Sequence, residues 1–163
     1  MALPPLSLKG RALRLLSGRE HSRAELERKL ATHEQEPGVL TRVLDELQAK
    51  GFISAQRVVD SVVHRRASKL GAARIRQELQ HKGLDPELVQ AAVAGLQASE
   101  LQRARDVWRK KFDPNRAGTG APALGASPAE RARQMRFLAA RGFSGDTIRR
   151  VVAGADDDDP PAD

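Results

Sequence analysis

The residues of this chain best suited to chemistry are its cations, which gather in four stretches. Phosphate groups are bound by Lys and Arg side chains on rigid elements, because counterion release supplies the affinity. The candidate contacts for a polyanionic partner are Arg65, Arg66, Lys69, Arg74, Arg76, Lys82, Arg109, Lys110 and Lys111. The fourth stretch contains Arg131, Arg133, Arg136 and Arg141. Any one of these residues is equally well explained as a solvated surface cation, so the prediction rests on the whole set.

The charge of the chain is unevenly distributed. The formal net charge is +7, and residues 156–163 hold five Asp and no cation. Without those five negative charges, the rest of the chain carries +12. A body this basic predicts a nucleic acid, a nucleoprotein or an acidic protein surface as partner. The simpler alternative is that the Arg content reflects a GC-rich genome.

No catalytic or metal-binding pattern accompanies the cations. The chain has no phosphate-binding loop of the Gly-x-x-x-x-Gly-Lys-Ser/Thr type, and the Gly118–Gly120 pair lies in a Gly/Ala/Pro-rich stretch. The four histidines lack partners at helical spacing, and cysteine is absent. We therefore expect no enzyme activity, no metal and no cofactor.

The composition favours an all-α protein that does not enter a membrane. Aromatic residues make up only 3% of the chain, so its cores must be built mainly from Leu, Val, Ile and Ala. No run of about 18 apolar residues is present to span a bilayer. The N-terminus lacks the basic start and apolar core of a signal peptide. We expect a cytoplasmic, monomeric protein.

A short helical phrase recurs and indicates which elements carry the cations. An apolar helix face ends on a basic residue, a glycine follows, and an apolar residue comes next. The copies are Leu47–Phe52, Leu79–Leu84 and Leu138–Phe143. Glycine tolerates the left-handed cap and the cation complements the helix dipole, so each copy predicts a helix end with its apolar residue covering the turn.

Helical periodicity divides the chain into three groups of three helices. The first group, 8–53, includes a capping box opened by Ser22 and an apolar face on Leu40, Val43, Leu44 and Leu47. The second group, 54–98, begins with four valines whose spacing favours a helix over a strand. The third group, 99–154, contains a loop at 113–126, and a disordered acidic tail follows at 155–163. We predict tandem three-helix modules that form an elongated, curved helical array.

The register of the phrase differs among the groups. The copies ending at Gly83 and Gly142 close the second helix of their groups, whereas the copy at Gly51 closes a third helix. The repeating unit is therefore the three-helix group, and the expected binding surface is extended and asymmetric.

A different local interpretation comes from residues 22–54. They resemble the core of a winged helix-turn-helix, with helices at 24–31 and 39–50. A wing requires a β-hairpin next, but residues 55–69 continue with helical spacing. A DNA-binding protein that acts on its own, either helical or winged-helix, stays open as the alternative.

The chain as a whole resembles the RecX family over residues 8–153. The motifs that carry the resemblance are Ser22-x-x-Glu25-Leu26-x-x-Lys29-Leu30, Leu44-x-x-Leu47-x-x-x-Gly51-Phe52-Ile53-Ser54, Gly71-x-x-x-Ile75-x-x-Glu78-Leu79-x-x-Lys82-Gly83-Leu84 and Arg136-Phe137-Leu138-x-x-Arg141-Gly142-Phe143. The insertion at 113–126 departs in length from the compact pattern of the family.

The resemblance implies a fold and a function. Members of this family are non-enzymatic, all-α regulators built from tandem three-helix modules. They bind filaments of the RecA recombinase on single-stranded DNA and reduce ATP hydrolysis, strand exchange and co-protease activity in recombination, repair and the SOS response. The expected partners are the RecA filament and single-stranded DNA, with double-stranded DNA as a further candidate.

Overall fold

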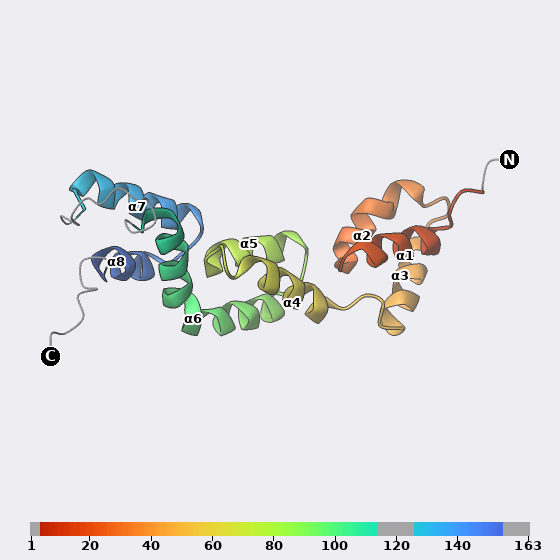
Figure 1. Cartoon of the computed structure of the whole chain (residues 1–163). Helices are drawn as coiled ribbons and strands as arrows, with labels where there is room; N and C mark the ends of the chain where they lie inside the picture. Colours follow the sequence, from red (N-terminus) through yellow and green to blue (C-terminus); the bar gives the residue numbers. More distant parts are fainter. Residues whose placement is uncertain (1–3, 114–125, 155–163) are drawn as a thin grey trace. The chain divides into compact units, whose positions relative to one another are not determined.

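The computed structural model describes residues 4–113 and 126–154, and all regular structure in these residues is helical (Figure 1). The all-α prediction is confirmed. The helices are α1 Leu8–Gly18, α2 Arg23–Leu30, the short 3-10 helix η1 Ala31–His33, α3 Val39–Ala49, α4 Ala55–Arg66, α5 Ala72–His81, α6 Pro86–Phe112, α7 Pro128–Ala140 and α8 Gly145–Gly154. Most of the predicted loop at 113–126 and the acidic tail lie outside the described residues.

The chain divides into two compact units. Unit 1 consists of Met1–Val62 and Glu78–Val89, and unit 2 consists of Val63–Gln77 and Gln90–Asp163. The divisions fall inside α4, α5 and α6, so the second predicted helical group contributes to both units.

Unit 1 is built on α1, α2 and α3, and the capping box that the sequence predicts for α2 is present. The Ser7 hydroxyl accepts a bond from the Gly10 N–H at the start of α1. A full capping box opens α2, in which Ser22 and Glu25 bond to each other's backbone N–H. The apolar faces of the three helices enclose one core that contains Leu26, Leu30 and Leu44.

The valine-rich segment of α4 is helical, as its spacing predicts. Val58, Val59 and Val62 are buried. Polar residues lie between them at positions that face outward on a helix, and the burial of one face compensates for the weak helix propensity of β-branched residues. In α5 the two predicted inward residues, Ile75 and Leu79, are fully buried.

The helix α6 spans the boundary predicted between the second and third groups. The third group was expected to begin near Ser99, and α6 runs across this point without interruption for 27 residues. Its buried residues follow one stripe along the whole length: Val89, Val93, Leu96, Glu100, Ala104 and Val107. Near Ser99, the Leu96 carbonyl accepts side-chain bonds from Ser99 and Arg103. The apolar stripe persists through this point, so the chain stays helical.

In unit 2, α6, α7 and α8 pack around a second hydrophobic core. A second full capping box, Ser127 with Glu130, opens α7. The core contains Leu138, Phe143 and Val151, with Trp108 packed against it.

The three helix ends that stop at a glycine have the predicted left-handed backbone conformation. The apolar residue after the glycine is not buried in all of them. Gly51, Gly83 and Gly142 have φ of 79°, 69° and 84°. The N–H groups of Phe52 and Phe143 reach back to the carbonyls of the preceding helix, as in a Schellman motif. Phe143 is buried, but Phe52 is 48% exposed and leaves its turn uncovered. The surroundings of the turns differ in the same way: a Cβ atom added at Gly51 would meet nothing within 4 Å, whereas one at Gly83 would meet Ala24 and one at Gly142 would meet Arg74.

Candidate functional site

Eight of the nine predicted contact cations lie in unit 2, and Lys82 alone belongs to unit 1. The eight are exposed and come from the end of α4, the following turn, the start of α5 and the end of α6: Arg65, Arg66, Lys69, Arg74, Arg76, Arg109, Lys110 and Lys111. Unit 2 therefore contains nearly all of the predicted site.

The α4–α5 corner, residues 65–76, is held in shape by Arg103, a half-buried side chain of α6. The Arg103 guanidinium donates to the Ala67 carbonyl at 3.0 Å and to the Leu70 carbonyl at 2.7 Å. These carbonyls lie just after α4, where a cation complements the negative end of the helix dipole. Burial lowers the pKa of Arg103, and the nearby Glu100 carboxylate opposes that shift. The charged Arg103 side chain thus fixes the turn between α4 and α5 through these two hydrogen bonds.

The end of α7 contacts the start of α5 through the backbone. The Gly71 N–H donates to the Arg141 carbonyl at 2.8 Å, and the Ala73 N–H donates to the Gly142 carbonyl at 3.2 Å. Helix N-termini have unpaired N–H groups and helix C-termini have unpaired carbonyls, so each end satisfies the other. This contact, which we call the Gly71–Gly142 contact, brings the cations of α5 close to those of α7.

The approach of the two backbones depends on the absence of side chains. A Cβ atom on Gly71 would lie 2.2 Å from the Gly142 carbonyl oxygen, and one on Gly142 would lie 2.4 Å from Cγ of Arg74. Both distances are far shorter than an ordinary van der Waals contact. Glycine is therefore required at both positions for this geometry.

A buried carboxylate lies beneath the same contact. Glu100 of α6 is 8% exposed and accepts from the Ala72 N–H at 3.3 Å, the Ser144 hydroxyl at 3.0 Å and the Thr147 hydroxyl at 2.8 Å. Its donors come from the start of α5 and from the start of α8. One acid thus serves two helix N-termini, where negative charge is favourable.

The cations at the ends of α6 and α7 surround an aromatic cluster. Phe112 and Phe137 meet edge to face with ring centroids 5.1 Å apart. The Arg141 guanidinium lies 3.9 Å from the centre of the Phe137 ring, and the Lys111 ammonium lies at 5.9 Å. Cation–π attraction therefore orders two cations on this side of unit 2.

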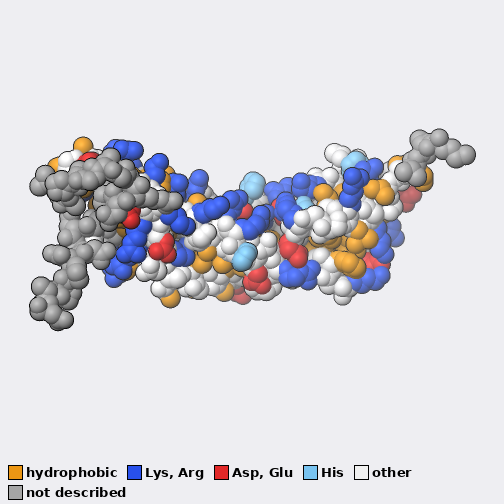
Figure 2. Space-filling model, in the orientation of Figure 1, with side chains coloured by type: hydrophobic (Ala, Val, Ile, Leu, Met, Phe, Trp, Pro, Cys, Tyr) orange, Lys and Arg blue, Asp and Glu red, His pale blue; other side chains and the backbone are white. Residues whose placement is uncertain are grey.

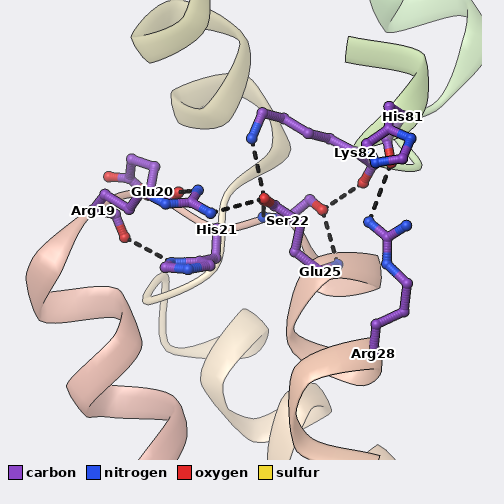
Figure 3. A network of polar contacts seen from close by, with 8 residues as sticks. All are labelled: Arg19, Glu20, His21, Ser22, Glu25, Arg28, His81 and Lys82. Atoms are coloured by element: carbon purple, nitrogen blue, oxygen red, sulfur yellow. Dashed lines mark hydrogen bonds and ion pairs between the residues drawn. The ribbon is translucent and has the colours of Figure 1, made fainter. Parts of the chain in front are cut away.

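Lys82 has a structural contact rather than an exposed position (Figure 3). It is 9% exposed, and its ammonium lies 3.0 Å from the Glu25 carboxylate at the start of α2. Its backbone carbonyl accepts a short bond from the Ser22 hydroxyl, and the His81 carbonyl accepts from Arg28. The end of α5 is thus bonded to the start of α2, and the placement argues against Lys82 as a surface contact.

The ionisation of Glu25 reflects this network. Burial alone would raise the pKa of the Glu25 carboxyl, but the Ser22 N–H and the cationic groups of Arg19 and Lys82 outweigh it and lower the pKa to about 2. His21, buried beside them, has its pKa lowered, chiefly by desolvation. The Glu25 carboxylate therefore stays charged at neutral pH.

The chemistry available on the described surface is that of anion binding. Figure 2 shows blue Lys and Arg side chains covering more of the visible face than red Asp and Glu. Among the described residues, no group of three or more His, Cys, Asp and Glu could hold a metal ion. In the same residues, no helix is long and apolar enough to cross a bilayer. Fixed cations without a coordinating cluster suit a phosphate backbone or an acidic surface.

The sequence reasoning missed three residues that build this site: Gly71, Glu100 and Arg103. Gly71 appeared only in a motif that carries the family resemblance, with no structural role assigned to it. Glu100 gives one signal in retrospect, because it occupies a position on the buried stripe of α6 where an apolar residue is the rule. An acid at such a position implies a set of buried donors, but the sequence does not identify them.

Comparison with known proteins shows the relationship of the chain. Family models described as the first, second and third three-helix domains of RecX match residues 9–47, 56–93 and 98–152. A protein of Leptothrix cholodnii named Regulatory protein RecX is 53% identical over 153 residues, which cover 94% of this chain and 92% of that protein. A protein of Ralstonia nicotianae with the same name is 49% identical and covers 96% and 94%.

Solved structures agree with the fold. The crystal structure of RecX from Lactobacillus salivarius matches with a TM-score of 0.70 at 21% identity, covering 91% of this chain and 94% of that one. Another structure, titled regulatory protein RecX, matches with a TM-score of 0.69 at 20% identity, covering 88% and 70%. Together with the three matching domain models and the near full-length relatives, these likenesses lead to one conclusion: the chain belongs to the RecX family of regulatory proteins.

Proposed function

We propose that this protein binds RecA filaments formed on single-stranded DNA and lowers their ATP hydrolysis, strand exchange and co-protease activity. Family membership supports the proposal, since relatives bear the name of a regulatory protein. The observation that carries it is the Gly71–Gly142 contact, which joins the cations of the α4–α5 corner to those of α7 within unit 2. The proposal includes a cytoplasmic monomer that has no enzyme activity of its own.

The affinity for the filament should be the sum of many weak contacts. An exposed ion pair contributes only about 0–1 kcal/mol, so no single cation of this surface should dominate. Several cations on rigid helices release several counterions together, which gives tight but salt-sensitive binding. The surface of unit 2 meets this requirement, because its cations are carried by helices and by a turn fixed by Arg103.

The direct test is the DNA-dependent ATPase of RecA with the purified protein added. Hydrolysis should fall as the protein concentration rises, and the protein should co-sediment with the filaments. An unchanged ATPase at saturating protein, together with no binding to filaments, would refute the proposal.

A matched pair of variants locates the surface. Lys69→Glu with Arg76→Glu reverses two exposed cations of unit 2, and Lys29→Glu with Arg42→Glu reverses two exposed cations of unit 1. The change in net charge is identical. The unit 2 variant should lose inhibition, and the unit 1 variant should keep most of it. Equal losses would mean that total charge, rather than the unit 2 surface, governs binding.

The alternative function is DNA binding that is independent of RecA. The same cationic surface favours it, but its winged-helix form conflicts with the fold, because α4 occupies the position of the required hairpin. Electrophoretic mobility shifts with and without RecA separate the two functions. Sequence-selective binding in the absence of RecA, combined with an unchanged ATPase, would favour the alternative.

A further inference from the structure

We propose that Glu100 is a positioning residue for DNA binding. Its buried carboxylate sets the relative placement of the cations on α5 and α7 that contact the phosphate backbone, and Glu100 itself touches no DNA. The proposal rests on the proposed function, in that it assigns single-stranded DNA to the unit 2 surface.

Residues from the starts of two helices converge on the Glu100 side chain. The carboxylate of Glu100 receives its donors from the start of α5 through Ala72 and from the start of α8 through Ser144 and Thr147. Ser144 follows Phe143 directly, so the Glu100–Ser144 bond also fixes the turn that ends α7. A single acid therefore ties together the helices on both sides of the Gly71–Gly142 contact.

Arg103, on the same helix as Glu100, holds the other end of the turn between α4 and α5. Arg103 binds the Ala67 and Leu70 carbonyls after α4, and Glu100 binds the Ala72 N–H at the start of α5. The residues between these points form the turn of the α4–α5 corner. The two ends of the turn are thus held by charges of opposite sign from one rigid helix. The exposed Lys69 lies within this turn, and the exposed Arg74 lies in the first turn of α5, directly after it.

Two of the donors that bind Glu100 have no substitute for its carboxylate. Ala72 and Thr147 are 9% and 7% exposed, so water has little access to them, whereas Ser144 is exposed. A buried donor that loses its acceptor must move to find another. The movement available to Ala72 and Thr147 shifts the start of α5 and the start of α8, which follows the end of α7 directly, and the spacing between the cations of α5 and α7 changes.

The proposal makes a prediction opposite in sign to simple electrostatics. Glu100→Gln removes a negative charge from a basic unit, so a purely electrostatic role predicts tighter DNA binding. A positioning role predicts weaker binding, because cations that no longer match the phosphate spacing release fewer counterions. Loss of one phosphate contact lowers the slope of log K against log salt by about 0.7 for a single strand and weakens binding roughly fivefold at 0.1 M salt relative to 1 M.

The experiment is fluorescence anisotropy of a labelled single-stranded oligonucleotide across a salt series, with wild type and three variants. Glu100→Gln and Glu100→Asp should each weaken binding about fivefold at 0.1 M salt and flatten the slope by about one contact. Glu100→Asp keeps the charge, so electrostatics alone predicts no change for it. The matched control is Glu25→Gln, which removes a buried acid of unit 1 that is also 8% exposed. It should leave the slope unchanged.

The outcomes are distinguishable. If both Glu100 variants keep the wild-type slope of log K against log salt and bind DNA as tightly as wild type or more tightly, the positioning role is overturned. The proposed function is unaffected by that result. An equal flattening in Glu25→Gln overturns the positioning role as well, since general destabilisation then explains the effect. No DNA binding by the wild-type protein overturns the assignment of DNA to this surface. Far-UV circular dichroism checks folding, and unfolding of both Glu100 variants would make Glu100 a requirement of the fold and overturn the proposal.

Discussion

Replacing Gly71 with alanine should separate the end of α7 from the start of α5. The new Cβ would lie 2.2 Å from the Gly142 carbonyl oxygen and 2.3 Å from the Phe143 nitrogen, which are backbone atoms of a fixed turn. Gly71 itself does not have a positive φ, so the cost arises from the contact and not from backbone strain.

The magnitude follows from the distances. The turn must withdraw by about 1 Å to reach an acceptable contact, which stretches the 2.8 Å bond from Gly71 to Arg141 and the 3.2 Å bond from Ala73 to Gly142 beyond hydrogen-bonding range. Each lost bond costs about 0.5–1.5 kcal/mol, and more where the group stays buried. The expected loss is about 2–4 kcal/mol of unfolding free energy, equivalent to a fall of roughly 4–16 °C in melting temperature.

The assay uses the single tryptophan of the chain. Trp108 packs against the unit 2 core, so its fluorescence during urea unfolding reports on that unit. The matched control is Gly95→Ala in α6, where nothing lies within 4 Å of the added carbon. That substitution should stabilise the protein by about 0.5–1 kcal/mol, because alanine is the better helix former.

The two substitutions are chemically identical and should differ in sign. A Gly71→Ala protein as stable as the wild type would refute the argument, because it would mean that the α5–α7 contact contributes nothing. Destabilisation by Gly95→Ala would show that the control position is not open as described.

Three further predictions concern unit 1 and the tail. Gly83→Ala should destabilise more than Gly51→Ala in thermal unfolding, since both have a positive φ but only Gly83 has a neighbour, the Ala24 Cβ at 2.7 Å; equal losses would contradict the contact. The Glu25 carboxyl has its pKa lowered to about 2, below its ordinary 4.5, so its contribution of roughly 3 kcal/mol is present above pH 4.5 and is lost as the pH falls towards 2. Urea unfolding at several pH values should therefore show a shallower acid loss for Glu25→Gln than for wild type, and parallel curves would argue against the ion pair. Deleting residues 156–163 removes five negative charges and should raise the affinity for single-stranded DNA at low salt; an unchanged affinity would count against shielding of the basic body by the tail.

The helices could be predicted from the sequence because their signals are local. A capping box spans four residues, a glycine stop depends on one φ, and an apolar face repeats within two turns. Local signals did not show that one helix spans the predicted boundary at Ser99, because the continuity of α6 follows from a buried stripe that extends on both sides of that point.

The site was only partly predictable. The cations of unit 2 stood out by type and clustering, and eight of the nine are exposed. Lys82 has the same sequence signal as Arg76, but its ammonium lies against Glu25, a residue 57 positions away. No local pattern distinguishes a cation that faces solvent from one that meets a distant acid.

The sequence alone thus determined the all-α class, the positions where helices start and stop, and the excess of positive charge. These properties depend on propensity, capping and composition, which act over a few neighbouring residues. Only the tertiary structure decided that Gly71 meets Gly142 and that Glu100 binds the starts of two helices. It also decided that Lys82 is buried while Phe52 is exposed. These facts depend on which helix ends meet, and that is settled by packing between segments far apart in the chain.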